Sequence, residues 1–169
     1  MQSHLIASKA APRGKYNMRF LELKLPPVLT LLIFIGLAVL LRYLAVGTAL
    51  PPWTAKASPV LIMAGVLASL SGLWQFRRAQ TTVDPTHPDK ASTLVTGGIY
   101  QYTRNPMYLG MALVLSAAVL KSGLVVSIIL LPLFIWYMTR FQIKPEESAI
   151  ERIFAEEYSA YKRRVRRWL

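Results

Sequence analysis

The chain has 169 residues, 54% of them hydrophobic, with a mean hydropathy of +0.38 and a formal net charge of +12. It contains no cysteine, which excludes disulfides, thiolate metal sites and a cysteine nucleophile. The charges stand in blocks between uncharged runs, which is the pattern of a membrane protein whose basic residues face anionic headgroups. No segment is long enough for a folded basic domain, so a nucleic-acid partner is not expected. The two histidines, His4 and His87, are too far apart in sequence to suggest a metal site.

The polar, basic N-terminal segment covers residues 1–24 and has no apolar core of the kind found in signal peptides. Residues 1–17 carry no pattern, and Met18 is a candidate translation start, so we expect residues 1–17 to be dispensable. We expect residues 25–169 to form a single membrane domain.

The uncharged runs predict an all-α integral membrane protein with about four transmembrane helices, because a 30 Å hydrocarbon core needs about 20 helical residues. The first is long enough only if it continues past Arg42, whose side chain would then snorkel to the interface. Lys121, Ser122 and Gly123 leave almost no loop between the last two helices, which favours a tight antiparallel hairpin. The predicted membrane helices cover residues 26–49, 57–76, 106–120 and 122–139.

The basic residues predict the orientation. The N-terminal segment, the second loop and the C-terminal tail share one side of the membrane and hold 17 of the 20 lysines and arginines. By the positive-inside rule that side is cytoplasmic, so both termini are expected in the cytoplasm, with the inner membrane of a bacterium as the expected location.

Residues 77–105 form a cytoplasmic connector that is too long for a simple turn, and loops of that length in compact proteins are usually functional or disordered. The β-branched and aromatic residues of 94–102 favour an ordered segment. Within it, Gly97 and Gly98 allow positive φ and close approach of a ligand or another backbone. A plain turn is the alternative interpretation of the glycine pair.

Arg104 and Asn105 stand directly before Pro106, where the third apolar run begins. Proline suits the first turn of a helix and asparagine suits the N-cap, so the two residues before the proline read as a cap. A guanidinium and a helix N-terminus therefore converge, and together they can bind an anionic group. The alternative is an ordinary arginine anchor at the membrane boundary.

Residues 146–167 read as an amphipathic helix. Two acids, Glu146 and Glu147, stand in its first turn, and acids this close to an anionic bilayer suggest a cationic partner such as Arg140, Arg104 or a ligand. A surface-lying membrane anchor is the alternative interpretation. The apolar face recurs every three or four residues, at Ile150, Ile153, Phe154, Tyr158, Tyr161, Val165 and Trp168.

Together these motifs resemble the superfamily of isoprenylcysteine carboxyl methyltransferases and phospholipid methyltransferases. The resemblance covers about half of the chain, with the helical hairpin between its two halves. The matching motifs lie at residues 81–85, 94–100 and 104–108, at Glu146, Glu147, Phe154, Glu157, Tyr158 and Tyr161, and at residues 165–168.

The chain departs from the family pattern at three positions. Asn105 stands where the eukaryotic carboxyl methyltransferases have histidine, so their prenyl-cysteine substrate does not carry over. Ala155 replaces the usual glycine, and Arg166 replaces the usual proline. Sterol reductases have a similar C-terminal architecture but a different tail, which makes them and their nicotinamide cofactor a remote alternative.

The resemblance implies S-adenosyl-L-methionine as cofactor, methyl transfer to a lipid-like or membrane-partitioned acceptor, and a site between the last two membrane helices and the tail. Whether the acceptor is a carboxylate, a thiol or an amine stays open, and a non-catalytic membrane protein on the same scaffold is the other hypothesis. Of the two adjacent acids, Glu147 is predicted to bind the ligand. The expected catalytic residues are Arg104, Tyr108 and Glu147; the expected cofactor-binding residues are Gly97, Gly98, Tyr100, Arg104, Asn105, Pro106, Tyr108, Glu146, Glu147 and Tyr158.

Overall fold

A computed structural model describes residues 25–79 and 93–169, and within these ranges the chain is all-α, with no β-strand. The prediction of an all-α fold is therefore confirmed. The motif at 81–85, residues 80–92 of the connector, both histidines and residues 1–17 lie outside the described residues. The helices are α1 (Pro27–Tyr43), α2 (Ser58–Arg78), α3 (Pro106–Ser122), α4 (Leu130–Met138) and α5 (Lys144–Arg164), with short helical turns η2 (Pro52–Ala57), η4 (Gly98–Gln101) and η5 (Val125–Ile129) and a π-helical segment η6 (Thr139–Ile143).

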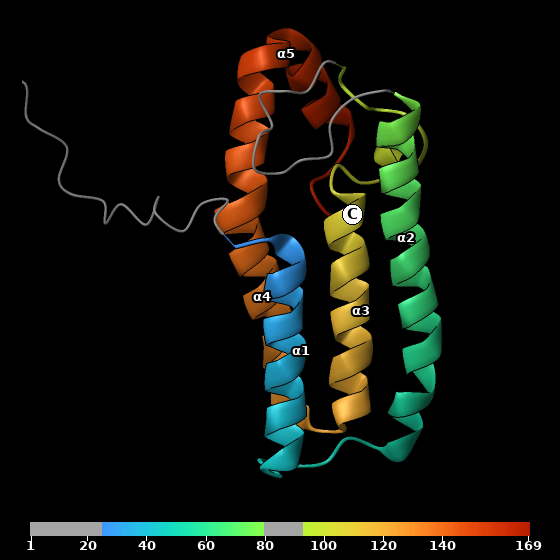
Figure 1. The fold of residues 1–169 in the computed structure, drawn as a ribbon, viewed down its shortest axis with the longest axis vertical. Helices are drawn as coiled ribbons and strands as arrows, with labels where there is room; N and C mark the ends of the chain where they lie inside the picture. The colour runs from blue at the N-terminus through green and yellow to red at the C-terminus, as the bar shows by residue number, and fades with distance from the viewer. Residues whose placement is uncertain (1–24, 80–92) are drawn as a thin grey trace, which may run out of the picture.

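Within the described residues, two continuous helical stretches, Pro52–Arg78 and Val125–Arg164, are long and apolar enough to cross a membrane. The helices α1 and α3 are apolar but shorter, at 17 residues each. Both reach about 25 Å at the usual helical rise, which is near the lower limit for a span. Figure 1 shows the long helices running side by side, with α3 at the centre of the bundle and in contact with α1, α2 and α4.

Small residues hold α2 tightly against α3. A Cβ added to Gly65 would lie 2.6 Å from the carbonyl oxygen of Gly110, and one added to Gly110 would lie 2.4 Å from the carbonyl oxygen of Gly65. The hydroxyl of Ser58 also donates a hydrogen bond to the carbonyl of Ala117 at 3.0 Å. Close backbone approach is the usual way to gain packing energy between membrane helices, where lipid competes for every apolar contact. These contacts hold α2 and α3 side by side in antiparallel directions, with the start of α2 against the end of α3.

The first helix ends earlier than predicted. It stops at Tyr43, and the chain then turns through Ala45 and Gly47, which have φ of 49° and 91°. The expectation of a first helix that continues past Arg42 to residue 49 is wrong, and the Nη1 of Arg42 donates to the carbonyl of Ser122 at 2.7 Å. The last turn of α3 thereby gains a cationic partner, which a helix C-terminus favours.

The hairpin between the third and fourth apolar runs turns close to the predicted place. Gly123 takes a left-handed conformation with φ of 73° as the C-cap of α3. The fourth helix begins a few residues later than predicted, because η5 precedes α4. The first loop pairs with this turn, since the N–H of Leu50 donates to the carbonyl of Gly123 at 2.6 Å and Val125 donates to Thr48 at 2.9 Å.

The C-terminal part is not one straight amphipathic helix. The helix that starts in α4 continues through η6 into α5, and the chain reverses at Ala155, where φ is 31° and ψ is −103°. Figure 1 shows the second half of α5 turning back, so that the C-terminus lies beside the start of α3. The apolar residues Tyr158, Tyr161 and Val165 are therefore buried inside the protein, while Ile153 is left exposed.

Candidate functional site

Main-chain and side-chain hydrogen bonds join the C-terminal tail to the segment before α3. The N–H of Arg104 donates to the carbonyl of Arg166 at 3.0 Å. The carbonyl of Arg167 accepts from the hydroxyl of Thr103 at 3.3 Å and from the amide nitrogen of Asn105 at 2.9 Å. Residues more than 60 positions apart thus form one rigid junction at the end of the bundle.

Asn105 is the N-cap residue of α3, but its side chain makes no capping hydrogen bond. The prediction of a capping amide is wrong in this respect, because the side chain is used to hold the tail. The hydroxyl of Thr103 accepts a hydrogen bond from the Asn105 N–H at 3.2 Å instead.

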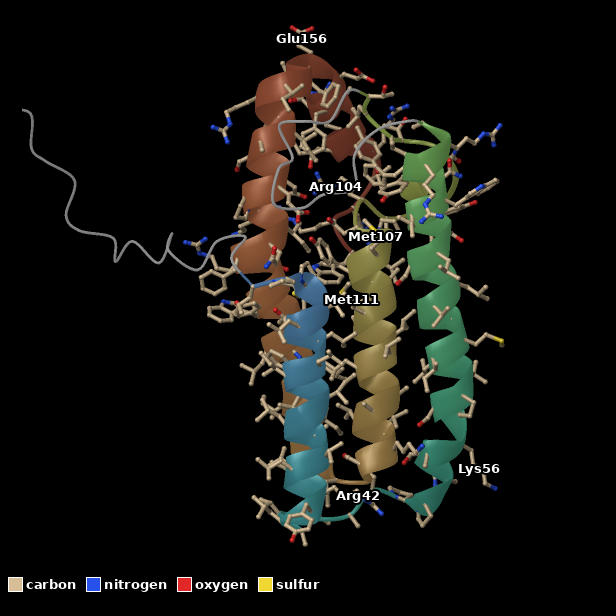
Figure 2. The ribbon with its side chains drawn as sticks, viewed as in Figure 1. Arg42, Lys56, Arg104, Met107, Met111 and Glu156 are labelled. Carbon is tan, nitrogen blue, oxygen red and sulfur yellow. The ribbon has the colours of Figure 1, made fainter. Side chains whose placement is uncertain are left out.

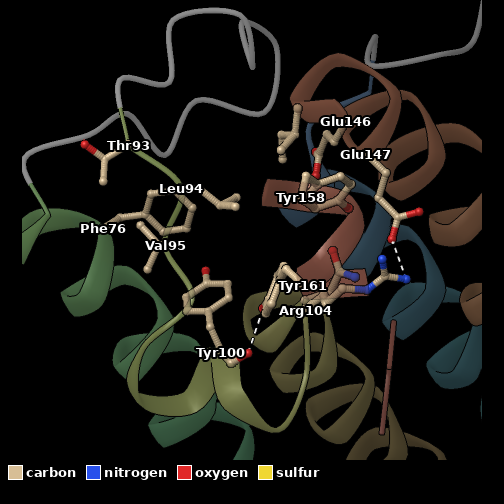
Figure 3. A pocket seen from close by; sticks show the side chains of 12 residues that line it. Phe76, Thr93, Leu94, Val95, Tyr100, Arg104, Glu146, Glu147, Tyr158 and Tyr161 are labelled. Atoms are coloured by element: carbon tan, nitrogen blue, oxygen red, sulfur yellow. Dashed lines mark hydrogen bonds and ion pairs between the residues drawn. The ribbon is translucent and has the colours of Figure 1, made fainter. Parts of the chain in front are cut away.

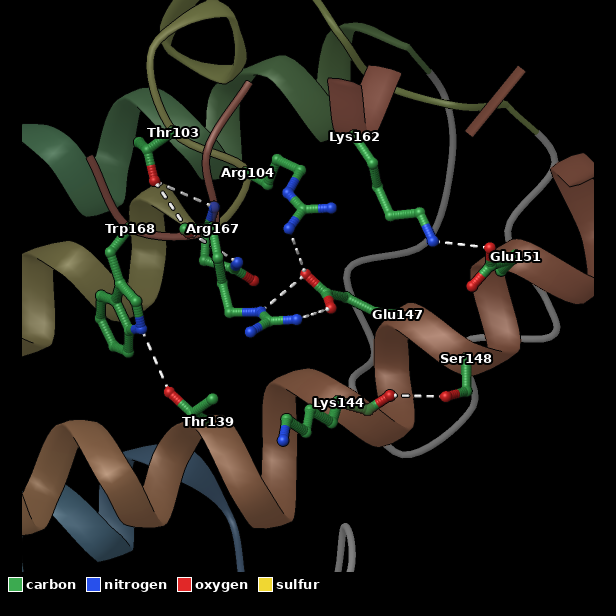
Figure 4. A network of polar contacts seen from close by, with 11 residues as sticks. Thr103, Arg104, Thr139, Lys144, Glu147, Ser148, Glu151, Lys162, Arg167 and Trp168 are labelled. Atoms are coloured by element: carbon green, nitrogen blue, oxygen red, sulfur yellow. Dashed lines mark hydrogen bonds and ion pairs between the residues drawn. The ribbon is translucent and has the colours of Figure 1, made fainter. Parts of the chain in front are cut away.

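Glu147 joins two arginines at this junction (Figure 4). Its Oε1 and Oε2 accept hydrogen bonds from Nε and Nη2 of Arg167 at 3.1 and 2.6 Å. The same Oε1 forms an ion pair with Nη2 of Arg104 at 3.1 Å. Hydrogen bonding to this carboxylate raises the pKa of the Arg167 guanidinium above its ordinary value. Both oxygens of Glu147 are therefore already occupied by side chains of the protein.

Arg104 is the unusual member of this group. Its side chain is only 9% exposed, yet its Nε and Nη1 are buried and have no hydrogen-bond partner. Buried polar groups of this kind are rare, since each one costs about 1–3 kcal/mol and more when it is charged. The guanidinium also lies 6.0 Å from the centroid of the Tyr158 ring, within the range of a cation–π contact.

Glu146 faces a different partner from its neighbour. Its Oε1 accepts a hydrogen bond of 2.5 Å from the hydroxyl of Tyr108. Glu146 lies beyond the apolar part of the helix, which ends near Arg140 and Lys144. Burial raises the pKa of the Glu146 carboxyl to about 8, with a smaller contribution from the nearby charge of Glu147. The Glu146 carboxyl therefore binds a proton more tightly than an ordinary glutamate does.

These side chains border a cavity of about 70 Å³ (Figure 3). An aromatic wall closes it, with Phe76 and Tyr100 in an edge-to-face contact at 5.5 Å between ring centroids. The hydroxyl of Tyr161 donates to the carbonyl of Tyr100 at 2.6 Å and fixes the wall to α5. Burial raises the pKa of the Tyr100 and Tyr161 hydroxyls, which therefore stay neutral. The lining residues are Phe76, Thr93, Leu94, Val95, Tyr100, Arg104, Asn105, Glu146, Glu147, Ile150, Tyr158 and Tyr161.

The structure brings together six of the predicted site residues as lining of this cavity, namely Tyr100, Arg104, Asn105, Glu146, Glu147 and Tyr158. Tyr108 reaches the cavity only through its hydrogen bond to Glu146. The remaining predicted residues, Gly97, Gly98 and Pro106, do not line it. Gly98 has φ of 59° and packs against Gln75, so the local structure explains why a glycine is needed there.

Sequence reasoning missed two parts of the site. Phe76 is the last residue of a predicted membrane helix, and only the packing of α2 against the connector brings it to the cavity. Arg167 lies in the motif at residues 165–168 but is not among the predicted site residues. Its place in the C-terminal motif next to Trp168 was the available signal. Trp168 is itself anchored, since its Nε1 donates to the hydroxyl of Thr139 at 3.1 Å.

Within the described parts of the chain, no group of three histidine, cysteine or acidic side chains is arranged to bind a metal ion.

The chain was compared with known proteins. The family model of phospholipid methyltransferases matches residues 53–157. An uncharacterized protein of Haemophilus influenzae is 41% identical over 63 residues, which cover 37% of this chain and the whole of that protein. The protein-S-isoprenylcysteine O-methyltransferase of Schizosaccharomyces pombe is 32% identical over 77 residues, which cover 46% of this chain and 33% of that enzyme. No solved structure matches.

The family match extends over well more than half of the sequence and includes Arg104, Glu146 and Glu147. The chain belongs to the phospholipid methyltransferase family. The resemblance found in the sequence motifs is thereby confirmed, and with two helices able to cross a membrane it identifies a membrane protein of a methyltransferase family.

Proposed function

We propose that this protein transfers a methyl group from S-adenosylmethionine to an acceptor that partitions into the membrane. The observation that carries the proposal is Arg104, a buried guanidinium with two unpartnered N–H positions at the edge of a cavity. The two unpartnered N–H positions cost folding free energy, so the burial of Arg104 favours a role in binding an anion.

The side chains of the cavity fit the chemical groups of this cofactor. Nε and Nη1 of Arg104 would hold its carboxylate through charge-assisted hydrogen bonds. The aromatic wall of Phe76, Tyr100 and Tyr158 suits a purine ring or a sulfonium cation. A cavity of about 70 Å³ can hold only one end of the molecule, and the presence of Arg104 and Glu146 in its lining favours the amino-acid end as its occupant.

We assign the ligand-binding acid to Glu146 and the orienting acid to Glu147, the reverse of the expectation from sequence. Both oxygens of Glu147 already interact with arginines, whereas Glu146 borders the cavity with a tyrosine as its hydrogen-bond donor. Glu146 is suited to bind the amino group or a ribose hydroxyl of the cofactor.

The cofactor supplies an electrophilic methyl group on a sulfonium, so the protein contributes chiefly alignment of the acceptor with the methyl carbon. A carboxylate or thiolate acceptor needs no base. An amine acceptor must lose a proton, and the hydrogen-bonded pair of Tyr108 and Glu146 is positioned to take it, directly or through water. Deprotonated Glu146 is the form that accepts a proton, and its raised pKa gives the group basicity near neutral pH.

We further propose four membrane spans with both termini in the cytoplasm, in the inner membrane of a bacterium. The excess of basic residues on one side supports this orientation, and Figure 2 shows Arg42 and Lys56 at the end of the bundle opposite Arg104 and Glu156. Since the chain has no cysteine, single cysteines introduced at Lys56 and Glu156 can be labelled in intact cells. Labelling of the Glu156 position from outside would contradict the proposed topology.

Two measurements test the proposed function. Purified protein in lipid nanodiscs is first titrated with S-adenosylmethionine by calorimetry, and membrane extracts are then screened for methyl transfer from the labelled cofactor. Binding followed by labelling of an extractable lipid or lipid-like compound would support the proposal. Binding without transfer to any extract component would favour the non-catalytic hypothesis, and absence of binding would contradict the proposed function itself.

A further inference from the structure

The tail contributes Arg167 to the site, and no part of the proposed reaction uses this residue. Its Nε and Nη2 bind the two oxygens of Glu147 in a fork, at 3.1 and 2.6 Å. Bidentate pairs of this kind are strong and fix the orientation of the carboxylate. Arg167, which follows the end of α5, therefore sets the orientation of the Glu147 carboxylate (Figure 4).

Arg104 makes fewer contacts with the Glu147 carboxylate than Arg167 does. Only its Nη2 pairs with Glu147, at 3.1 Å, and it shares Oε1 with the fork from Arg167. A Glu147 carboxylate without Arg167 would be free to turn toward the buried Arg104 and accept from more of its N–H groups. The positions Nε and Nη1 of Arg104, which are unpartnered now, would then be the ones at risk of being occupied.

The side chain of Arg167 is not needed to hold the tail in place. The tail is docked by the carbonyls of Arg166 and Arg167, which accept from Arg104 and from Thr103 and Asn105. The indole of Trp168 adds a further hydrogen bond to Thr139. A change in the Arg167 side chain alone leaves all of these contacts available, so its effect on the site can be separated from tail docking.

We propose that Arg167 is a positioning residue: it occupies Glu147 and thereby keeps Nε and Nη1 of Arg104 free for the anionic end of the ligand. The inference rests on the proposed function for the identity of that ligand. In this arrangement two arginines compete for the Glu147 carboxylate. Arg167 makes the bidentate contact, and Arg104 keeps two of its N–H positions available for a ligand.

The test uses the full chain in nanodiscs and S-adenosylmethionine as probe, with the variants Arg167→Gln, Arg167→Lys, Glu147→Gln and the double variant Arg167→Gln/Glu147→Gln. Arg164→Gln is the matched control, because Arg164 is exposed and lies three residues away. Arg167→Gln is expected to raise the dissociation constant about tenfold, the effect of one charge-assisted hydrogen bond. Arg167→Lys keeps the positive charge but loses the bidentate contact, so its dissociation constant should lie between those of the wild type and Arg167→Gln.

The double variant decides between positioning and a merely structural role. Without a charged carboxylate to capture Arg104, the double variant should bind the cofactor within about threefold of the Glu147→Gln variant, since the two side chains act as one unit. If Arg167→Gln weakens binding to the same extent with and without Glu147, the competition does not exist and the proposal fails.

A second measurement needs no ligand and separates this inference from the proposed function. Hydrogen exchange of the Arg104 Nε–H is followed by NMR on protein with ¹⁵N-labelled arginine, with the Arg104 signal assigned by its loss in Arg104→Lys. Exchange should slow in Arg167→Gln, because Glu147 then accepts from this group, and return to the wild-type rate in the double variant. Unchanged exchange in Arg167→Gln would overturn the inference, whereas a wild type that binds no cofactor would overturn only the proposed function.

Discussion

An arginine lies at each end of α3, Arg42 from the last turn of α1 and Arg104 from the segment before α3, and the two differ in how their charge is satisfied. Arg42 lies at the C-terminal end, is exposed, and donates to the carbonyl of Ser122, where a cation complements the helix dipole. Arg104 lies at the N-terminal end, where the dipole disfavours a cation, and it is buried with two unpartnered N–H positions. Figure 2 shows the pair at opposite ends of the bundle.

The difference teaches how to separate structural from functional charges in this fold. Arg42 donates a hydrogen bond to a free carbonyl at the end of α3, so its position is explained without a ligand. The surroundings of Arg104 offer one shared carboxylate oxygen and leave the rest of the guanidinium unsatisfied. Violations of local stability rules gather at functional sites, and this one coincides with the cavity.

Replacement of the two arginines is expected to give the largest contrast. Arg104→Ala should weaken binding of S-adenosylmethionine by about a hundredfold, because it removes two charge-assisted hydrogen bonds from a desolvated site. Arg104→Lys should rescue this loss poorly, since an ammonium does not reproduce the fork. Calorimetric titration in nanodiscs measures both. The matched control is Arg42→Ala, which should bind like the wild type; equal losses in both variants would erase the distinction between the two ends.

The pH dependence of stability sharpens the comparison at the site end. The folded-state pKa of Glu146 is raised from 4.5 to about 8, so the folded protein holds more protons than the unfolded chain between these values. The free energy of unfolding should therefore decrease as pH rises from about 4.5 to 8.

Glu146→Gln removes this contribution and keeps a partner for Tyr108. Thermal unfolding in detergent should show a midpoint that falls by about 10 °C less over this pH range than in the wild type. The same pH slope in both proteins would mean that Glu146 titrates normally. Glu151→Gln serves as control, because Glu151 is exposed and pairs with Lys162 at 2.6 Å.

At the opposite end, Arg42→Ala should act on stability alone. The loss of its hydrogen bond to the Ser122 carbonyl should lower the free energy of unfolding by about 1–2 kcal/mol. The measurement is chemical or thermal unfolding in detergent, with Lys56→Ala as a control at the same end of the bundle. A protein that is as stable as the wild type but binds the cofactor poorly would reverse the roles assigned to the two ends.

The smallest expected effect comes from the reversal in α5, a second place at the site end where a local rule is violated. Ala155 has φ of 31° and ψ of −103°, a conformation that alanine rarely adopts and glycine tolerates. Ala155→Gly should therefore stabilise the protein by about 1 kcal/mol and leave cofactor affinity unchanged. Ala149→Gly, in the regular helix, is the control and should be destabilising. A lower unfolding midpoint for Ala155→Gly would show that the reversal is not strained.

The sequence alone determined the helical class, the small turn at Gly123 and half of the residues that line the cavity. Apolar runs of helical length have few alternatives in a membrane, and the motifs around Arg104 and the two glutamates mark where polar chemistry gathers. It also determined the set of apolar residues in the tail, because a period of three to four places them on one side of each helical half.

Only the tertiary structure decided which partner each polar group takes. Alanine is a strong helix former, so the residue itself does not predict the reversal that carries Arg167 and Trp168 back to α3, although glycine is usual at this position in the family. With the chain reversed, Glu147 pairs with two arginines, and Asn105 binds the tail instead of capping α3. Glu146 accepts a hydrogen bond from Tyr108 and borders the cavity. Helical periodicity fixes which residues share a face, whereas contacts between residues 60 positions apart depend on where the helix breaks.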